Sequence, residues 1–424
     1  MQNRDRTLET GDRPTAAART HRSRNLLLNS LLLAFSVALS LSIPELFLRF
    51  CFRFEDTTLQ LDPRYLHRYK PNSQQLYQLS RSNGSKRLDV TINAEGRRGE
   101  LVDMSRPRIL VYGDSFIAAP FSPVKETFVS QLEQRLTDTL TPSPQAVNCG
   151  VHGYGPDQES LVMEDEIDRL KPRLILVAVY AGNDFGDLLR DKIYKLDGQM
   201  RLLENHYTLD PRLVSKFAAA NRLPRLYIAR VLERLWQPVA RLRDDEPKPR
   251  PGETYMDLWL RESQEEYQDY VINGDNGVRN LLEDHYDADV SLTPRSASSQ
   301  YKRILMDRVI EKMQQVANSR SVPFLLVVIP SPFDVVDNYA VAVDTQKYPE
   351  YRPSELSEVV EDIARRHQIP YVNFYKPFRE HGASPLYFVV DNDHWNAAGQ
   401  RLAAELVAAY IKQHHLLGTA ANVR

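Results

Sequence analysis

The sequence predicts an α/β protein: a three-layer α/β/α domain with a helical insertion, preceded by one N-terminal transmembrane helix. Three observations lead to this prediction. Residues 25–44 contain no charged side chain, and after residue 105 short apolar runs alternate with helical periods. Residues 186–298, between the third and fourth runs, lack strand signals. Alternating strand and helix patterns favour a parallel sheet with crossover helices.

The composition excludes several classes of protein. A chain of 424 residues allows one large domain with an insertion or two ordinary domains, and 42% hydrophobic residues exclude disorder along the whole chain. A net charge of −2, without a basic stripe, gives no support for a nucleic-acid partner. Cys51 and Cys149 allow at most one disulfide, not a disulfide framework or a four-thiolate zinc site. Nucleotide-binding and zinc-protease motifs are missing from the sequence, so we expect no cofactor and no metal.

The charge-free segment is long enough to cross a membrane. Twenty helical residues at 1.5 Å each reach about 30 Å, the thickness of a bilayer core. We therefore expect a cytoplasmic tail at residues 1–25 and a transmembrane anchor at 26–48. The alternative is a cleaved signal peptide, with a weak small-x-small site at 40–42. Arg22 and Arg24 beside the span favour a cytoplasmic N-terminus and an extracytoplasmic domain.

The rest of the chain divides into a lead-in, a domain and its insertion. Residues 49–105 are polar and are expected to form a juxtamembrane lead-in with a hairpin or loop at 81–87. The domain is expected over residues 106–415, and its insertion, about 186–298, should be helical in two pieces, near 211–243 and 255–273. Strands are expected at 109–112, 146–149, 174–180, 324–329 and 371–374, and helices at 126–136, 157–170, 299–319, 354–367 and 397–413.

The first two predicted strands are followed by motifs that suit acyl chemistry. Gly113-Asp114-Ser115 places a serine at the carboxyl end of the first strand, where α/β folds carry their active sites. The same three residues also make a common turn with a helix cap. The run Asn148–Gly155 after the second strand contains three glycines, which can expose backbone amides to an oxyanion. A plain βα turn is the alternative reading of this run.

Two further motifs follow later strands. Asn183 follows the third strand, where its side-chain amide could donate to the same oxyanion or, like Asp184, cap a helix. Asp391 stands three residues before His394, so it can orient the ring, and a histidine so held can take a serine proton. The alternative is that His394 and Trp395 pack under the last helix.

The four motifs together, in this order and each at a strand end, resemble the SGNH subgroup of the GDSL hydrolases, named for Ser, Gly, Asn and His in four blocks. The matching residues are Ser115, Gly153, Asn183 and His394, with Asp391 as the acid. The resemblance implies a flavodoxin-like sheet, Ser115 as nucleophile and His394 as general base. It also implies an oxyanion hole made of the Ser115 and Gly153 amides and the Asn183 side chain.

The resemblance covers about residues 106–415, except the insertion, and leaves alternatives within the site. Gly150 competes with Gly153, and Asp393 competes with Asp391. The side chain of an adjacent residue usually points away, which favours Asp391. Cys149 is a rival nucleophile, but it lies in a strand-end run and we interpret it as a packing residue.

The resemblance implies a membrane-anchored serine esterase acting on O-acyl groups of cell-envelope carbohydrate or lipid. An O-acyltransferase of an exported polysaccharide is the alternative, because the two differ only in whether water or a sugar hydroxyl resolves the acyl-serine. A non-catalytic envelope scaffold is the second alternative. The expected partners are the acylated substrate, the membrane and envelope polysaccharide machinery. We expect the insertion to form a lid or binding wall near Asn183.

Overall fold

A computed structural model describes most of the chain and divides it into two compact units. The described residues are 16–51, 58–221, 226–228, 247–282, 284–337, 339, 341, 343–389 and 393–418. One unit comprises Met1–Phe54 with Leu223–Asp244, and the other comprises Glu55–Arg222 with Asp245–Arg424.

The first unit contains helix α1 (Ala16–Cys51). Its segment Leu27–Phe50 is long and apolar enough to cross a membrane, by length and composition. Near the end of this segment Glu45 accepts a hydrogen bond from the Ile228 N–H (3.1 Å) and pairs with Arg49 (2.7 Å). The predicted apolar helix is therefore present, while the crossing and its direction stay predictions.

The second unit is built on a five-stranded parallel sheet, which confirms the predicted fold class. Its strand order is β13-β12-β7-β5-β6, and all four pairings are parallel. Each strand was predicted to within one residue at either end; β7 and β12 are continuous apolar runs, whereas β5, β6 and β13 combine a short apolar run with polar residues at their ends. The strands are β5 (Arg108–Tyr112), β6 (Gln145–Asn148), β7 (Leu174–Tyr180), β12 (Phe324–Ile329) and β13 (Tyr371–Asn373).

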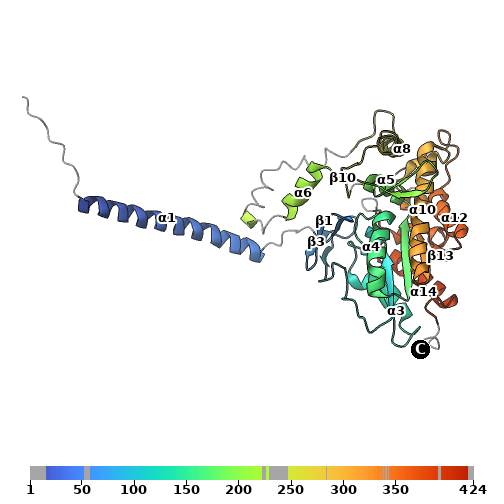
Figure 1. The fold of residues 1–424 in the computed structure, drawn as a ribbon, viewed down its shortest axis with the longest axis horizontal. Coiled ribbons are helices and arrows are strands. Elements are labelled where there is room, and N and C mark those ends of the chain that lie inside the picture. The colour runs from blue at the N-terminus through green and yellow to red at the C-terminus, as the bar shows by residue number, and fades with distance from the viewer. Residues whose placement is uncertain are drawn as a thin grey trace, which may run out of the picture. The chain divides into compact units, whose positions relative to one another are not determined.

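Helices cover both faces of the sheet. Because successive strand residues point to opposite faces, Ile109 and Val111 join one buried cluster and Leu110 and Tyr112 join the other. On the first face α3 packs against α14, and on the second α4 packs against α10. Figure 1 labels these helices beside the strands of the sheet. These helices are α3 (Phe128–Leu136), α4 (Pro156–Leu170), α10 (Ala297–Ser319), α12 (Glu355–Arg366) and α14 (Ala397–Gln413).

The polar lead-in forms two antiparallel hairpins, one of them at the predicted position around residues 81–87. The strands are β1 (Leu59–Asp62), β2 (Leu66–Tyr69), β3 (Gln74–Gln78) and β4 (Arg87–Thr91). Leu66, Val90 and Ile92 are buried in the same apolar cluster as Leu110 and Tyr112. The lead-in therefore packs on the α/β sheet.

The insertion is mainly helical, as expected, but it also contains short strands that the sequence analysis did not predict. β8 (Tyr194–Leu196) pairs with β9 (Leu202–Glu204), and β10 (Thr208–Leu209) pairs with β11 (Gly277–Val278). Strands of two or three residues are too short to show an alternating pattern. The expected helix at 211–243 is described only over α6, because residues 222–225 and 229–246 lie outside the described part. The helices here are α5 (Asp184–Asp191), α6 (Pro211–Asn221), α8 (Tyr255–Tyr267), a π-helical turn (Gln268–Ile272) and α9 (Ala288–Leu292).

Short helices complete the second unit at the carboxyl ends of the strands. They are α2 (Ser115–Ala118), α11 (Pro332–Val335), α13 (Tyr375–Glu380) and the 3₁₀ helices Val124–Glu126 and Ser384–Leu386. The loops after β5, β6 and β7 leave the sheet at the same edge, because their strands are parallel neighbours.

Candidate active site

Ser115 begins α2 directly after β5, on a turn that only glycine can make. A Cβ at Gly113 would lie 2.3 Å from Ile117 Cγ1. Asp114 caps the helix, since its Oδ1 accepts the Phe116 N–H at 2.8 Å. The Ser115 N–H precedes the first intrahelical bond and has no acceptor in the described part of the chain. The motif is thus a helix cap, and it also leaves a serine hydroxyl and its own amide at the strand end.

His394 lies against Ser115, although 279 residues separate them. The distance from His394 Nε2 to Ser115 Oγ is 2.7 Å. The imidazole stacks on the Phe116 ring, with centroids 4.6 Å apart, and Phe121 contacts it edge-on at 4.8 Å. Trp395, only 1% exposed, packs in the core as the alternative reading had it, whereas His394 faces the serine. Two aromatic contacts therefore hold the ring in hydrogen-bonding position.

A carboxylate contacts the other nitrogen of this ring. Asp393 Oδ1 lies 2.9 Å from His394 Nδ1, and Asp393 Oδ2 accepts the Tyr180 hydroxyl at 3.1 Å. Asp391, which the resemblance assigns as the acid, lies within residues 390–392, outside the described part, so its role stays a prediction. Its competitor Asp393 occupies the contact at Nδ1.

The charges around His394 favour its protonated form. Burial would lower the pKa of His394, but the charge and hydrogen bond of Asp393 outweigh it, with Asp114 and Asp284 adding to the effect, so the pKa is raised. Burial would raise the pKa of the Asp393 carboxyl, but the charge and hydrogen bond of His394 outweigh it, so this pKa is lowered. Burial raises the pKa of Asp114 to about 7. The surroundings therefore favour the imidazolium–carboxylate pair that would form when His394 takes the Ser115 proton.

Gly153 lies in the loop after β6 and has an available amide. Its φ is +75°, and a Cβ there would lie 2.6 Å from the Leu281 carbonyl oxygen, so glycine is required. No acceptor for the Gly153 N–H is found among the described residues. The competing glycine differs, because the Gly150 N–H already donates to Asn148 Oδ1 at 3.0 Å. Of the two, Gly153 lines the same cavity as Ser115.

Asn183 starts α5 after β7 and aims its amide into the site. It stands at the N-cap position, but its side chain makes no capping hydrogen bond. Its Nδ2 instead donates to Asp284 Oδ2 at 2.6 Å. The Asp184 carboxylate accepts the Tyr180 N–H at 2.8 Å. One N–H of the Asn183 amide is thus occupied by Asp284, and the second has no acceptor among the described residues.

These groups surround a cavity of about 100 Å³. Leu282 and Asp284, from the insertion, form part of its wall, while the expected role of the insertion as a lid or binding wall stays a prediction. Asp284 was not predicted, since it lies in a loop without a strand end or motif. The lining residues are Asp114, Ser115, Phe116, His152, Gly153, Tyr154, Tyr180, Asn183, Asp187, Leu282, Asp284, Asp393 and His394.

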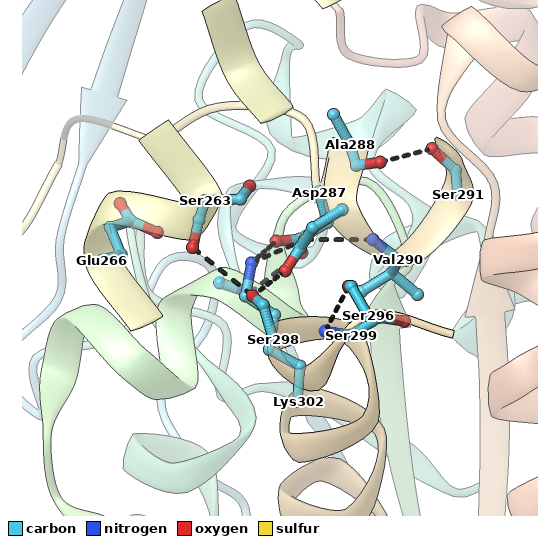
Figure 2. A network of polar contacts seen from close by, with 12 residues as sticks. Ser263, Glu266, Asp287, Ala288, Val290, Ser291, Ser296, Ser298, Ser299 and Lys302 are labelled. Carbon is cyan, nitrogen blue, oxygen red and sulfur yellow. Dashed lines mark hydrogen bonds and ion pairs between the residues drawn. The ribbon is translucent and has the colours of Figure 1, made fainter. Parts of the chain in front are cut away.

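A buried ion network anchors the loop that carries Asp284. The fully buried Lys302 Nζ lies 2.8 Å from Asp287 Oδ1 and 2.9 Å from Asp289 Oδ1, and Figure 2 shows Lys302 and Asp287 at the centre of this network. Asp287 Oδ2 also accepts the N–H of Gly186, in α5. Burial opposes protonation of Lys302, yet the two carboxylates raise its pKa. The network thus ties the loop to α5, whose N-cap residue is Asn183.

The lead-in also contacts the site, which the sequence did not reveal. The buried Arg98 guanidinium donates to the carbonyls of Ala118 (2.9 Å), Ala119 and Ser122. It therefore fixes the C-terminal end of α2 and the segment that leads past Phe121. Burial lowers the pKa of Arg98 to about 10. An arginine in a polar stretch gives no sequence signal for such a contact.

Among the described residues, neither a metal site nor a reactive thiol is found. Within the part of the chain that the structure describes, no group of three or more His, Cys, Asp or Glu residues is placed to hold a metal ion. Cys149 is buried in the apolar core, and burial raises the pKa of its thiol to about 12, which agrees with a packing role.

Comparison with known proteins identifies a family. The model of the GDSL-like lipase/acylhydrolase family matches residues 111–402. A search of curated proteins found no match. Similar solved structures include a lipase/acylhydrolase from Enterococcus faecalis (11% identity, 73% of this chain and 96% of that one, TM-score 0.34). A catalytic mutant of an acetylxylan esterase from Geobacillus stearothermophilus is another (12% identity, 72% of this chain and 94% of that one, TM-score 0.36). A third is a GDSL-like lipase from Bacteroides thetaiotaomicron (12% identity, 74% of this chain and 93% of that one, TM-score 0.33).

Proposed function

Because the chain belongs to the GDSL-like lipase/acylhydrolase family, we propose that it is a membrane-anchored serine esterase that removes short O-acyl groups from cell-envelope carbohydrate. One observation carries the chemistry. Ser115 Oγ lies 2.7 Å from His394 Nε2, and Asp393 contacts the opposite ring nitrogen. This arrangement of hydroxyl, imidazole and carboxylate activates a serine nucleophile.

In the proposed reaction, His394 Nε2 takes the Ser115 hydroxyl proton while Oγ attacks the ester carbonyl carbon. The bond from that carbon to the alcohol oxygen then breaks, and the imidazolium returns the proton to the leaving alcohol. Water attacks the acyl-serine by the same route and releases the carboxylic acid. A carboxylate at Nδ1, Asp393 in the described contact, stabilises the imidazolium in both steps.

Three donors are proposed to stabilise the oxyanion: the N–H groups of Ser115 and Gly153 and the side-chain amide of Asn183. The two backbone groups have no acceptor in the described part of the chain. One N–H of the Asn183 amide is directed to Asp284, which leaves the second for the oxyanion. Preorganised donors of this kind act on charge that develops in the transition state.

The cavity supports a short, uncharged acyl group. A cavity of about 100 Å³ has room for several water molecules, which is enough for a short acyl group. The carboxyl groups of Asp114, Asp187, Asp284 and Asp393 line it, which disfavours both an apolar chain and an anionic substrate. An acetyl ester of a neutral sugar hydroxyl meets both conditions.

Membrane anchoring is proposed on the apolar segment Leu27–Phe50 of α1. Arg22 and Arg24 precede it, so the N-terminus would be cytoplasmic and the α/β domain extracytoplasmic. Envelope carbohydrate would then be the substrate within reach, and envelope polysaccharide machinery the neighbouring partner.

O-acyl transfer is the second candidate, and the insertion favours it. The Leu281 carbonyl and the Leu282 side chain press on Gly153 so closely that a Cβ there would lie 2.6 and 2.8 Å from them. The insertion thus lies against a proposed oxyanion donor, and an acceptor hydroxyl bound to this wall would resolve the acyl-serine in place of water.

The test uses the full-length protein in detergent. A fluorophosphonate probe should label Ser115, and Ser115→Ala should abolish labelling and turnover while the fold is kept. With acetylated oligosaccharides, release of free acetate indicates hydrolysis, and acetyl transfer to added sugar indicates the second candidate. Undiminished turnover by Ser115→Ala would rule out the proposed mechanism.

A further inference from the structure

We propose that His67 is a positioning residue for the oxyanion hole, which aims the Gly153 N–H through the peptide bond joining His152 to Gly153. The proposal rests on the function proposed above. His67 belongs to β2 of the lead-in and is fully buried. Its Nε2 lies 2.8 Å from the His152 carbonyl oxygen.

The partner atom determines which ring nitrogen of His67 carries the proton. A carbonyl oxygen can only accept, so Nε2 must donate and Nδ1 is left as an acceptor. The Gln158 amide Nε2 lies 3.4 Å from this Nδ1 and also donates to the Tyr65 carbonyl at 2.7 Å. Burial lowers the pKa of His67 to about 4, so the ring is neutral at neutral pH. The Nε2–H form is therefore held from both sides.

The geometry of the peptide group transmits this contact to Gly153. In a planar trans peptide the C=O of one residue and the N–H of the next point in opposite directions. Fixing the His152 oxygen therefore fixes the direction of the Gly153 N–H. Glycine has wide conformational freedom, so the peptide on its N-terminal side needs an external anchor. A hydrogen bond to the carbonyl also polarises the same amide and strengthens its donor.

Other contacts bring the lead-in and this loop together. The Tyr154 hydroxyl donates to the His67 carbonyl at 2.7 Å, and the two rings meet edge-on at 5.1 Å. Gln158 Oε1 accepts the Gly155 N–H at 3.0 Å. Among the described residues, His67 is the one donor to the His152 carbonyl. The segment that follows the membrane helix thus supplies a part of the oxyanion geometry.

The test compares two substitutions of His67 in the full-length protein. His67→Leu removes the donor, and we expect kcat on an acetyl ester to fall by about 10–100-fold, less than or near the loss of a whole oxyanion donor, with KM unchanged. The affinity for a trifluoromethyl ketone, which forms a charged tetrahedral adduct, should fall by the same factor. His67→Gln keeps an N–H at similar reach and should restore most of kcat.

Tyr69→Phe is the matched control. The Tyr69 hydroxyl accepts the His152 N–H at 3.4 Å. This N–H belongs to the peptide that precedes the His152–Gly153 peptide, so removing the hydroxyl should leave kcat unchanged. A His67→Leu effect confined to thermal stability or KM, or a failure of glutamine to restore kcat, would overturn the proposal.

One measurement does not depend on any variant folding. ¹⁵N NMR of the imidazole groups of the native protein should show His67 with Nε2 protonated and Nδ1 bare. The opposite tautomer would overturn the proposal, since the His152 oxygen cannot donate. Ser115→Ala tests the proposed function separately from the proposed role of His67. If Ser115→Ala retains turnover, the proposed function fails, whereas the tautomer of His67 is measured independently of turnover.

Discussion

Asp393→Asn should remove most of the activity while preserving the fold. The substitution keeps the size of the side chain but removes the charge that lies 2.9 Å from His394 Nδ1. An asparagine can present its NH₂ to Nδ1, which favours the tautomer with a proton on Nε2. That tautomer cannot accept the Ser115 proton. The corresponding change in serine proteases costs about 10⁴ in kcat, and we expect a loss of this order.

The same substitution should shift the pH profile. Two opposite charges about 4 Å apart attract by roughly 4 kcal/mol at an effective dielectric constant of about 20 and by about 1 kcal/mol in water. The Asp393 side chain is 40% exposed and that of His394 is 14% exposed, so solvent screening places the pair in the lower half of this range, about 1–2 kcal/mol. Losing this attraction removes the largest stabilisation of the imidazolium, so the pKa of His394 should fall.

The assay is kcat/KM on a small acetyl ester between pH 4 and pH 9. His394 must be neutral to act as a base, and its pKa is raised above the ordinary value, so native activity should fall as the pH drops through that raised pKa. In Asp393→Asn the residual activity should persist to lower pH. Asp391→Asn is the matched control, because it removes an equal charge two residues away.

The reasoning fails if the two aspartates exchange behaviour. A large loss and a lowered pKa in Asp391→Asn, with a mild effect in Asp393→Asn, would assign the acid to the residue three before the histidine, as the family resemblance implies. Circular dichroism of both variants excludes unfolding as the cause of either result.

Three further outcomes are expected. Asn183→Ala should lower kcat by about 10²–10³ with little change in KM, and an effect on KM alone would instead indicate a substrate-binding role. Asp284→Asn should shift the acid limb to lower pH, because the Asp284 charge contributes to the raised pKa of His394; an unchanged limb would contradict this. Lys302→Met should lower the free energy of unfolding by about 3–5 kcal/mol in urea titrations, because it leaves two buried carboxylates without their cation. Lys312→Met, which breaks a half-exposed pair with Glu164, should cost about 1 kcal/mol or less, and equal losses in the two variants would refute the argument.

The sheet could be predicted because its strands lie between two layers of helices. β7 and β12 are buried along their whole length, so their sequences are continuous apolar runs that no surface element would carry. The insertion was less predictable. β10 and β11 have two residues each and pair with each other across more than sixty residues, and such pairings leave no local pattern.

The site divides in the same way. Ser115, Gly153 and Asn183 could be proposed as site residues because each follows a strand, and parallel strands bring their carboxyl ends to one edge. His394 was proposed on the same ground, but it follows the 3₁₀ helix Ser384–Leu386 and not a strand of the sheet. The cavity that joins them is visible only in three dimensions, as is Asp284 on its wall. Sequence spacing favoured Asp391, which lies outside the described residues and stays a prediction, whereas the described contact at His394 Nδ1 belongs to its competitor Asp393.

The lead-in shows most clearly why the sequence was insufficient. A polar stretch after an apolar segment has the composition of a linker, and neither His67 nor Arg98 stands in a motif. Both side chains are buried, and both donate to backbone carbonyls, of His152 and of Ala118. Every residue has a backbone carbonyl, so the residue types of the acceptors, His152 and Ala118, give no sequence signal for these hydrogen bonds. The two loops that carry Ser115 and Gly153 are therefore held by a segment that composition alone would treat as a spacer.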